Sequence, residues 1–130
     1  LEMPVEGNHE PFIMGSPVVG CQIGEENLLA VLDTGAGLSY LRDARLATFG
    51  KPLGRTRDFH PMLGEFEVDT VDCSVMVGNQ SLTEVFGLAT EDLQRLMKMA
   101  KIDAILGTSW FQKCVVEIDF KNELVGLTID

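Results

Sequence analysis

The sequence has no long apolar run and few basic residues. None of its apolar runs approaches the roughly 20 residues that a membrane-spanning helix needs. Ten basic residues stand against twenty acidic ones, and the resulting net charge of -10 repels nucleic acid phosphates and anionic lipid surfaces. We therefore expect neither nucleic acid nor a membrane among its partners.

Cysteine and histidine are also scarce. The three cysteines, Cys21, Cys73 and Cys114, lie far apart, and an odd number leaves at least one thiol unpaired. Together with His9 and His60 they lack the spacing of a zinc site, so we predict no metal. The first residues show no basic segment followed by an apolar one, as a signal peptide would, although a trimmed sequence would look the same. These observations favour a cytoplasmic location.

Strand patterns dominate the chain. A length of 130 residues, 45% of them apolar, suffices for one domain with its own core, and we predict a single domain over residues 1–130. Residues 1–11 carry two prolines and a glycine with few apolar residues, so we interpret them as a loose arm rather than a strand. Apolar runs, alternating patterns and turn clusters predict strands over residues 18–23, 28–32, 65–77, 81–88, 104–107, 115–120 and 124–127.

Two short helices interrupt these strands. Asp43 is a suitable N-cap for a helix over residues 44–49, which Gly50 ends. Thr90 caps a second helix over residues 91–100, with acidic residues in its first turn and a lysine in its last. The sequence therefore predicts an all-β fold with one or two short helices.

Asp33 stands out because it is an acid at the end of an otherwise apolar strand. It follows the apolar run of residues 28–32 and precedes Thr34 and Gly35, which favour a turn. A buried, unpaired charge costs more free energy than strand contacts return, so we interpret Asp33 as a residue kept for chemistry. Alternatively, Asp33 only accepts hydrogen bonds within a tight turn.

Residues 58–64 are unusually apolar for a turn. They lie between two extended runs and contain a proline and Gly64, which predicts the tip of a hairpin. The tip carries three large apolar side chains, Phe59, Met62 and Leu63. Exposed apolar patches usually contact a ligand or a partner, and we interpret these side chains in that way. Alternatively, the three side chains fold back onto the core.

The segment Leu32-Asp33-Thr34-Gly35-Ala36, taken with the later Ile102-Asp103-Ala104-Ile105-Leu106-Gly107, resembles the retropepsin-like aspartic proteases. The resemblance covers most of residues 18–128 and implies a single-lobe, all-β, retropepsin-like barrel. In that family the Asp-Thr-Gly loop crosses beneath a second segment of two apolar residues and a glycine, here Ile105, Leu106 and Gly107.

This resemblance implies an aspartic endopeptidase, in which two carboxylates activate a water that hydrolyses a peptide bond. The chain has one Asp-Thr-Gly, so the second carboxylate must be Asp33 of a partner subunit in a symmetric homodimer. By resemblance, Thr34 hydrogen-bonds across the dimer axis, Gly35 lets the backbone approach the substrate, and Ala36 replaces a serine common in pepsin-like relatives. The substrate is then a peptide or a protein, and no cofactor is implied.

The same resemblance makes the predicted hairpin tip the flap that closes over a bound substrate. Phe59, Met62, Leu63 and Gly64 would be its substrate-binding residues. Thr108 follows the glycine of the second segment, where retroviral enzymes have an arginine that braces the dimer, so we expect different dimer contacts.

Two alternatives stay open. A catalytically silent peptide-binding or dimerisation module would keep the fold without turnover, and the charge of -10 on each chain opposes close pairing at low salt. The chain could also be one domain of a longer protein that supplies the second aspartate. No Gly-x-Ser-x-Gly motif points to a serine hydrolase, and Trp110, beside Phe111, is expected to pack in the core.

Overall fold

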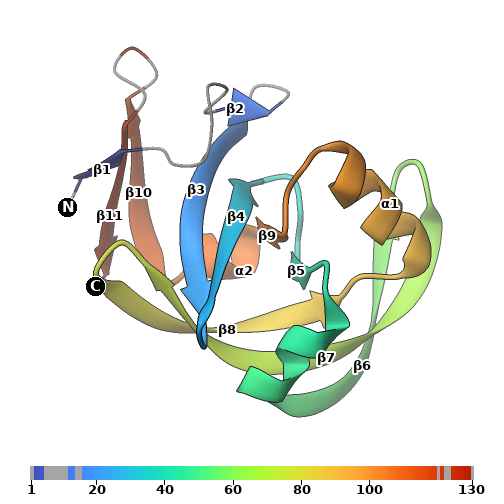
Figure 1. Cartoon of the computed structure of the whole chain (residues 1–130). Coiled ribbons are helices and arrows are strands. Elements are labelled where there is room, and N and C mark those ends of the chain that lie inside the picture. The colour runs from blue at the N-terminus through green and yellow to red at the C-terminus, as the bar shows by residue number, and fades with distance from the viewer. Residues whose placement is uncertain (1, 5–11, 14–15, 120, 122–123, 130) are drawn as a thin grey trace.

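The computed structural model describes residues 2–4, 12–13, 16–119, 121 and 124–129. Strands make up most of this part of the chain, as predicted, with two α-helices and one 3-10 helix (Figure 1). The elements are β1 (Glu2–Pro4), β2 (Phe12–Ile13), β3 (Ser16–Ile23), β4 (Glu26–Leu32), β5 (Ser39–Leu41), η1 (Ala44–Phe49), β6 (Gly50–His60), β7 (Gly64–Val77), β8 (Gln80–Leu88), α1 (Glu91–Met99), β9 (Ala104–Leu106), α2 (Thr108–Phe111), β10 (Cys114–Asp119) and β11 (Leu124–Ile129).

The strands form two sheets. The larger sheet has eight strands in the order β2-β3-β4-β9-β5-β8-β7-β6, and β3 also pairs with β7. The smaller sheet has the order β1-β11-β10 (Figure 1). The extra β3–β7 pairing, of Gln22 with Met76, joins the two ends of the run β3-β4-β9-β5-β8-β7, while β2 and β6 lie outside this ring. The all-β class is confirmed, whereas the predicted barrel is closed by this one residue pair.

Two pairs of predicted strands form hairpins, and a glycine lies in the turn of each. β3 and β4 are joined at Gly24, which has a φ of 58° and lies against the ring of Phe49. A Cβ at Gly24 would stand 2.3 Å from that ring and would force it to move, and the positive φ also favours glycine there. β7 and β8 are joined in the same way at Gly78, with a φ of 63°.

The two helices that the sequence predicted, η1 and α1, begin at their predicted caps. The side chain of Thr90 accepts a hydrogen bond from the backbone N–H of Leu93 at the start of α1. The side chain of Asp43 accepts one from the N–H of Arg45, and its carbonyl accepts one from the N–H of Leu46. Because this second bond spans three residues, the first helix is a short 3-10 helix.

The prediction of a loose arm over residues 1–11 is wrong for residues 2–4. These residues form β1, which pairs with β11 from Glu2 opposite Gly126 to Pro4 opposite Leu124. The pairing partner lies more than a hundred residues away in the sequence, so local composition could not reveal it. The rest of the predicted arm, residues 1 and 5–11, lies outside the described residues.

Two clusters of buried side chains form the core on opposite faces of the large sheet. Along β4, Ala30 and Leu32 belong to the first cluster and Val31 to the second. Along β9, Leu106 belongs to the first cluster, whereas Ile105 packs against the second. Because the side chains of a strand alternate between its two faces, the clusters cover β4 and β9 on both faces. This explains why the sequences of these strands are continuous apolar runs rather than alternating ones. The first cluster includes Trp110 as predicted, and α1 contributes to the second.

Candidate active site

Asp33 is the first residue after β4 and lies in a tight turn. Its side chain is half-buried, while Thr34 and Gly35 are exposed. The Asp33 carboxylate accepts a hydrogen bond of 2.9 Å from the N–H of Gly35, and the Asp33 carbonyl accepts one of 3.2 Å from the N–H of Ala36. The carboxylate is therefore oriented by its own loop and still reaches solvent.

The second predicted segment lies beside this turn. β9 runs parallel to β4, with Val31 opposite Ile105 and Leu32 opposite Leu106, and antiparallel to β5 on its other side (Figure 1). The Leu106 carbonyl accepts a hydrogen bond of 3.0 Å from the N–H of Asp33. The structure thus brings together the two segments that the sequence singled out.

Gly107 and Thr108 hold the Asp33 loop in place. A Cβ at Gly107 would lie 2.6 Å from the carbonyl oxygen of Ala36 and 2.8 Å from that of Leu38. The N–H of Thr108 donates to the Ala36 carbonyl at 2.7 Å, and its hydroxyl lies 3.1 Å from the Thr34 carbonyl oxygen. Backbone therefore packs directly on backbone at the site, and this packing requires glycine at position 107.

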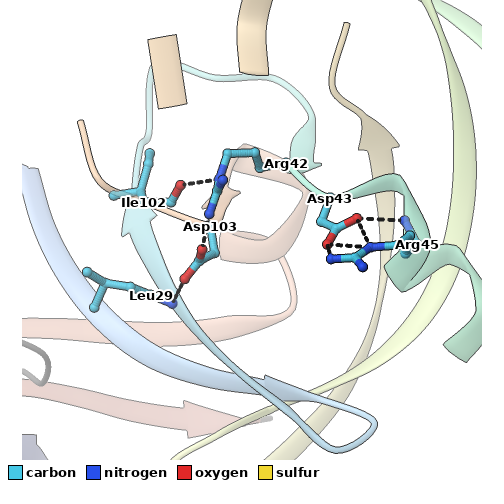
Figure 2. Close-up of polar contacts among 6 residues, drawn as sticks. All are labelled: Leu29, Arg42, Asp43, Arg45, Ile102 and Asp103. Carbon is cyan, nitrogen blue, oxygen red and sulfur yellow. Dashed lines mark hydrogen bonds and ion pairs between the residues drawn. The ribbon is translucent and has the colours of Figure 1, made fainter. Parts of the chain in front are cut away.

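An ion pair between Arg42 and Asp103 lies at the ends of β4, β5 and β9 that are remote from Asp33 (Figure 2). Arg42, which follows β5, donates to the Asp103 carboxylate at 2.5 Å and to the Ile102 carbonyl at 3.0 Å. The same carboxylate accepts a hydrogen bond of 2.9 Å from the N–H of Leu29 in β4. Asp103 thereby ties together the three strands that form the crossing, at the end remote from Asp33.

A second buried acid, which sequence reasoning missed, lies next to the site. Glu84 in β8 is fully buried, and the Ser39 hydroxyl, the Ser109 hydroxyl and the Lys113 ammonium group donate to its carboxylate. A signal was present in the sequence, because Glu84 occupies an inward position between the apolar Leu82 and Phe86. It is an acid at a strand position where the pattern predicts an apolar side chain.

The predicted flap is the tip of the β6–β7 hairpin. Phe59 and Met62 are exposed, at 63% and 76% of their surface, as a ligand-contacting role would require. Leu63 is partly buried and packs against the second cluster, so for this residue the alternative of folding back onto the core applies. Gly64 has a φ of 75°, a conformation that favours glycine and allows the chain to reverse.

A side-chain hydrogen bond tethers this hairpin to the body of the domain. The hydroxyl of Tyr40 in β5 donates to the carboxylate of Asp58 in β6. Burial, together with Asp58, raises the pKa of the Tyr40 hydroxyl, so the hydroxyl keeps its proton and remains a donor. The rings of Tyr40 and Phe66 also lie near each other, with centroids 6.3 Å apart.

The described residues contain no group of three histidine, cysteine or acidic side chains that could hold a metal ion. His60 is engaged in the hairpin tip, where its Nδ1 accepts a hydrogen bond of 3.1 Å from the N–H of Met62. Within the same part of the chain, no helix is both long and apolar enough to cross a membrane.

Comparison with solved structures places this arrangement in a known fold. The structure is similar to the crystal structure of the retroviral protease-like domain of Ddi1 from Leishmania major, with a TM-score of 0.53. The alignment covers 87% of this chain and 85% of the other, at 20% sequence identity. The fold is retropepsin-like. The sequence matches no protein-family model and no curated protein.

Proposed function

We propose that this chain is one subunit of a homodimeric aspartic endopeptidase in which each subunit contributes Asp33. The observation that carries the proposal is the half-buried carboxylate in an exposed Asp-Thr-Gly turn, held by a crossing segment in a retropepsin-like fold. A carboxylate kept only to close its own turn would not need the backbone packing of Gly107 and Thr108 around it. Thr34 and Gly35 are exposed, as contact with a partner subunit requires.

In the proposed reaction the two Asp33 carboxyl groups share one proton and bind one water between them. The ionised group takes a proton from the water, whose oxygen forms a bond to the scissile carbonyl carbon. The protonated group meanwhile donates its proton to the carbonyl oxygen. The Asp33 that took the proton from water then gives it to the amide nitrogen, while one hydroxyl of the tetrahedral diol returns its proton to the other Asp33. The C–N bond breaks, the amine and the carboxylic acid leave, and the dyad again holds one proton.

The substrate in this proposal is an extended peptide or protein segment that lies between the dyad and the β6–β7 hairpin. The exposed side chains of Phe59 and Met62 would contact it, and closure of the hairpin would exclude water from the dyad. Leu63 instead anchors the tip on the second cluster.

Digestion of a peptide library with three proteins tests the proposal. The wild type should cleave, and Asp33→Asn should not, because the amide cannot take a proton from water. Asp92→Asn is the matched control, since Asp92 is an exposed residue of α1 outside the site, and it should cleave like the wild type.

Sedimentation of the same samples at low and at high salt separates the remaining outcomes. Because each chain carries a charge of -10, salt should promote the dimer, and activity should rise with the dimer fraction. A dimer that cuts nothing would refute the proposal in favour of a silent module. An inactive monomer at every salt concentration would indicate a domain of a longer protein that supplies the second aspartate.

A further inference from the structure

Glu84 is the most deeply buried acid among the described residues. Its exposed fraction is 0%, and its two oxygens accept three hydrogen bonds from side chains. Ser39 of β5 donates at 2.6 Å and Ser109 of α2 at 2.8 Å, both to the same oxygen. Lys113, which follows α2, donates to the other oxygen at 2.9 Å. The carboxylate therefore links β8, β5 and the segment that follows β9.

Stability alone does not explain this arrangement. Taking a carboxylate and an ammonium group out of water is costly, and apolar replacements of buried ion pairs are often neutral or stabilising. Lys113 keeps 37% of its side chain exposed, so the pair is only partly withdrawn from water. What an apolar pair could not supply is a hydrogen-bond acceptor aimed at the Ser39 hydroxyl.

A chain of three hydrogen bonds runs from Glu84 to Asp33. Ser39 is itself fully buried, and its hydroxyl donates a hydrogen bond to Glu84. The Ser39 oxygen is then free to accept a hydrogen bond of 2.9 Å from the N–H of Gly107. The residue before Gly107 is Leu106, whose carbonyl accepts the N–H of Asp33 at 3.0 Å. The position of the Asp33 backbone thus depends on the position of the peptide group between Leu106 and Gly107, which Ser39 holds by its hydrogen bond.

We propose that Glu84 is a positioning residue for the Asp33 dyad, which acts by orienting the Ser39 hydroxyl toward the backbone of Gly107. This inference rests on the proposed function, because it assigns Glu84 a part in the same reaction. Neither Glu84 nor Ser39 contacts the substrate in this proposal, so their loss lowers kcat and leaves KM nearly unchanged.

A matched pair of double variants separates positioning from stability. Glu84→Leu with Lys113→Met removes both charges and the acceptor, whereas Glu84→Gln with Lys113→Met removes both charges but keeps an oxygen for Ser39. We expect the leucine variant to lose about tenfold or more in kcat at unchanged KM, and the glutamine variant to recover most of it. Equal kcat values for the two variants would overturn the proposal.

Ser39→Ala supplies a second test if the leucine variant does not fold. It removes the acceptor of the Gly107 N–H directly and should lower kcat to a similar extent, while Ser39→Thr, which keeps the hydroxyl, should restore it. A wild-type kcat in Ser39→Ala would also overturn the proposal.

Amide hydrogen exchange gives a readout that does not depend on cleavage. In Ser39→Ala, exchange at the N–H groups of Gly107 and Asp33 should accelerate, while exchange in α1 stays at its wild-type rate. If the wild type cleaves nothing but this local acceleration appears, the contact by which Ser39 holds the Gly107 and Asp33 backbone is established and the proposed function fails. If the wild type cleaves and exchange at both positions is unchanged, the positioning role fails and the proposed function stands.

Discussion

Gly107→Ala is the substitution for which the structure predicts the sharpest effect. The added Cβ would lie 2.6 Å from the Ala36 carbonyl oxygen and 2.8 Å from that of Leu38, whereas ordinary contact begins at 3.4 Å. The two segments would therefore have to separate by about 0.8 Å, and both obstacles are backbone atoms that no rotamer change can move. The Thr108 N–H bond to Ala36 would lengthen with them.

This separation should cost about 1–3 kcal/mol in the free energy of unfolding, as overpacking of a tight site does. It should also displace the Asp33 loop by a similar distance and lower kcat by about 10- to 100-fold. Urea unfolding and steady-state peptide cleavage measure the two effects. Both should appear in the same variant, because one contact produces them.

Gly37→Ala is the control, since it makes the same change in the same loop. A Cβ at Gly37 would have nothing within 4 Å, so its free energy of unfolding should stay within about 0.5 kcal/mol of the wild type. If Gly107→Ala were as stable and as active as Gly37→Ala, the close packing of the two segments, and the role assigned to it, would be refuted.

Three further changes test other parts of the structure. Trp110→Ala should lower the free energy of unfolding by about 3–5 kcal/mol in urea titrations, because the side chain is 1% exposed in the first cluster; a loss below 1 kcal/mol would contradict that packing. Burial, with the charge of Asp103, raises the pKa of the Cys21 thiol from 9.0 to about 12. The unfolded chain therefore loses this proton first, so stability should be fully present below pH 9 and decline between pH 9 and 12, and Cys21→Val should flatten that decline. Tyr40→Phe removes the donor to Asp58, so amide exchange at the hairpin tip should accelerate and KM should rise more than kcat falls; unchanged exchange there would show that this bond does not hold the hairpin.

The sequence predicted the elements whose signals are local. The apolar run before Asp33 and the caps at Asp43 and Thr90 each depend on a few neighbouring residues, and the structure has all of them. The closeness of the Asp33 loop to the segment Ile105 to Gly107 was predicted only through a family resemblance, because no local rule joins segments that lie some seventy residues apart.

The missed features depend on contacts between distant segments. β5 is a strand of three residues, Ser39–Leu41, that is too short to show a period, and it exists because β8 and β9 pair on its two sides. The inward direction of Leu63 depends on the second cluster, to which several strands and α1 contribute. Glu84 did leave a signal, because it is an acid at an inward position of an alternating strand, where an apolar side chain is expected.

Subunit mixing tests most directly whether two copies of Asp33 form one catalytic centre. A fixed amount of wild-type chain is allowed to exchange subunits with a tenfold excess of Asp33→Asn, and in parallel with the same excess of Asp92→Asn. If both carboxylates are needed, activity per wild-type chain should fall to about one tenth with Asp33→Asn, because nearly every wild-type chain then pairs with an inactive one. Total activity should instead rise with Asp92→Asn. An activity per wild-type chain that does not change as Asp33→Asn is added would contradict the shared dyad.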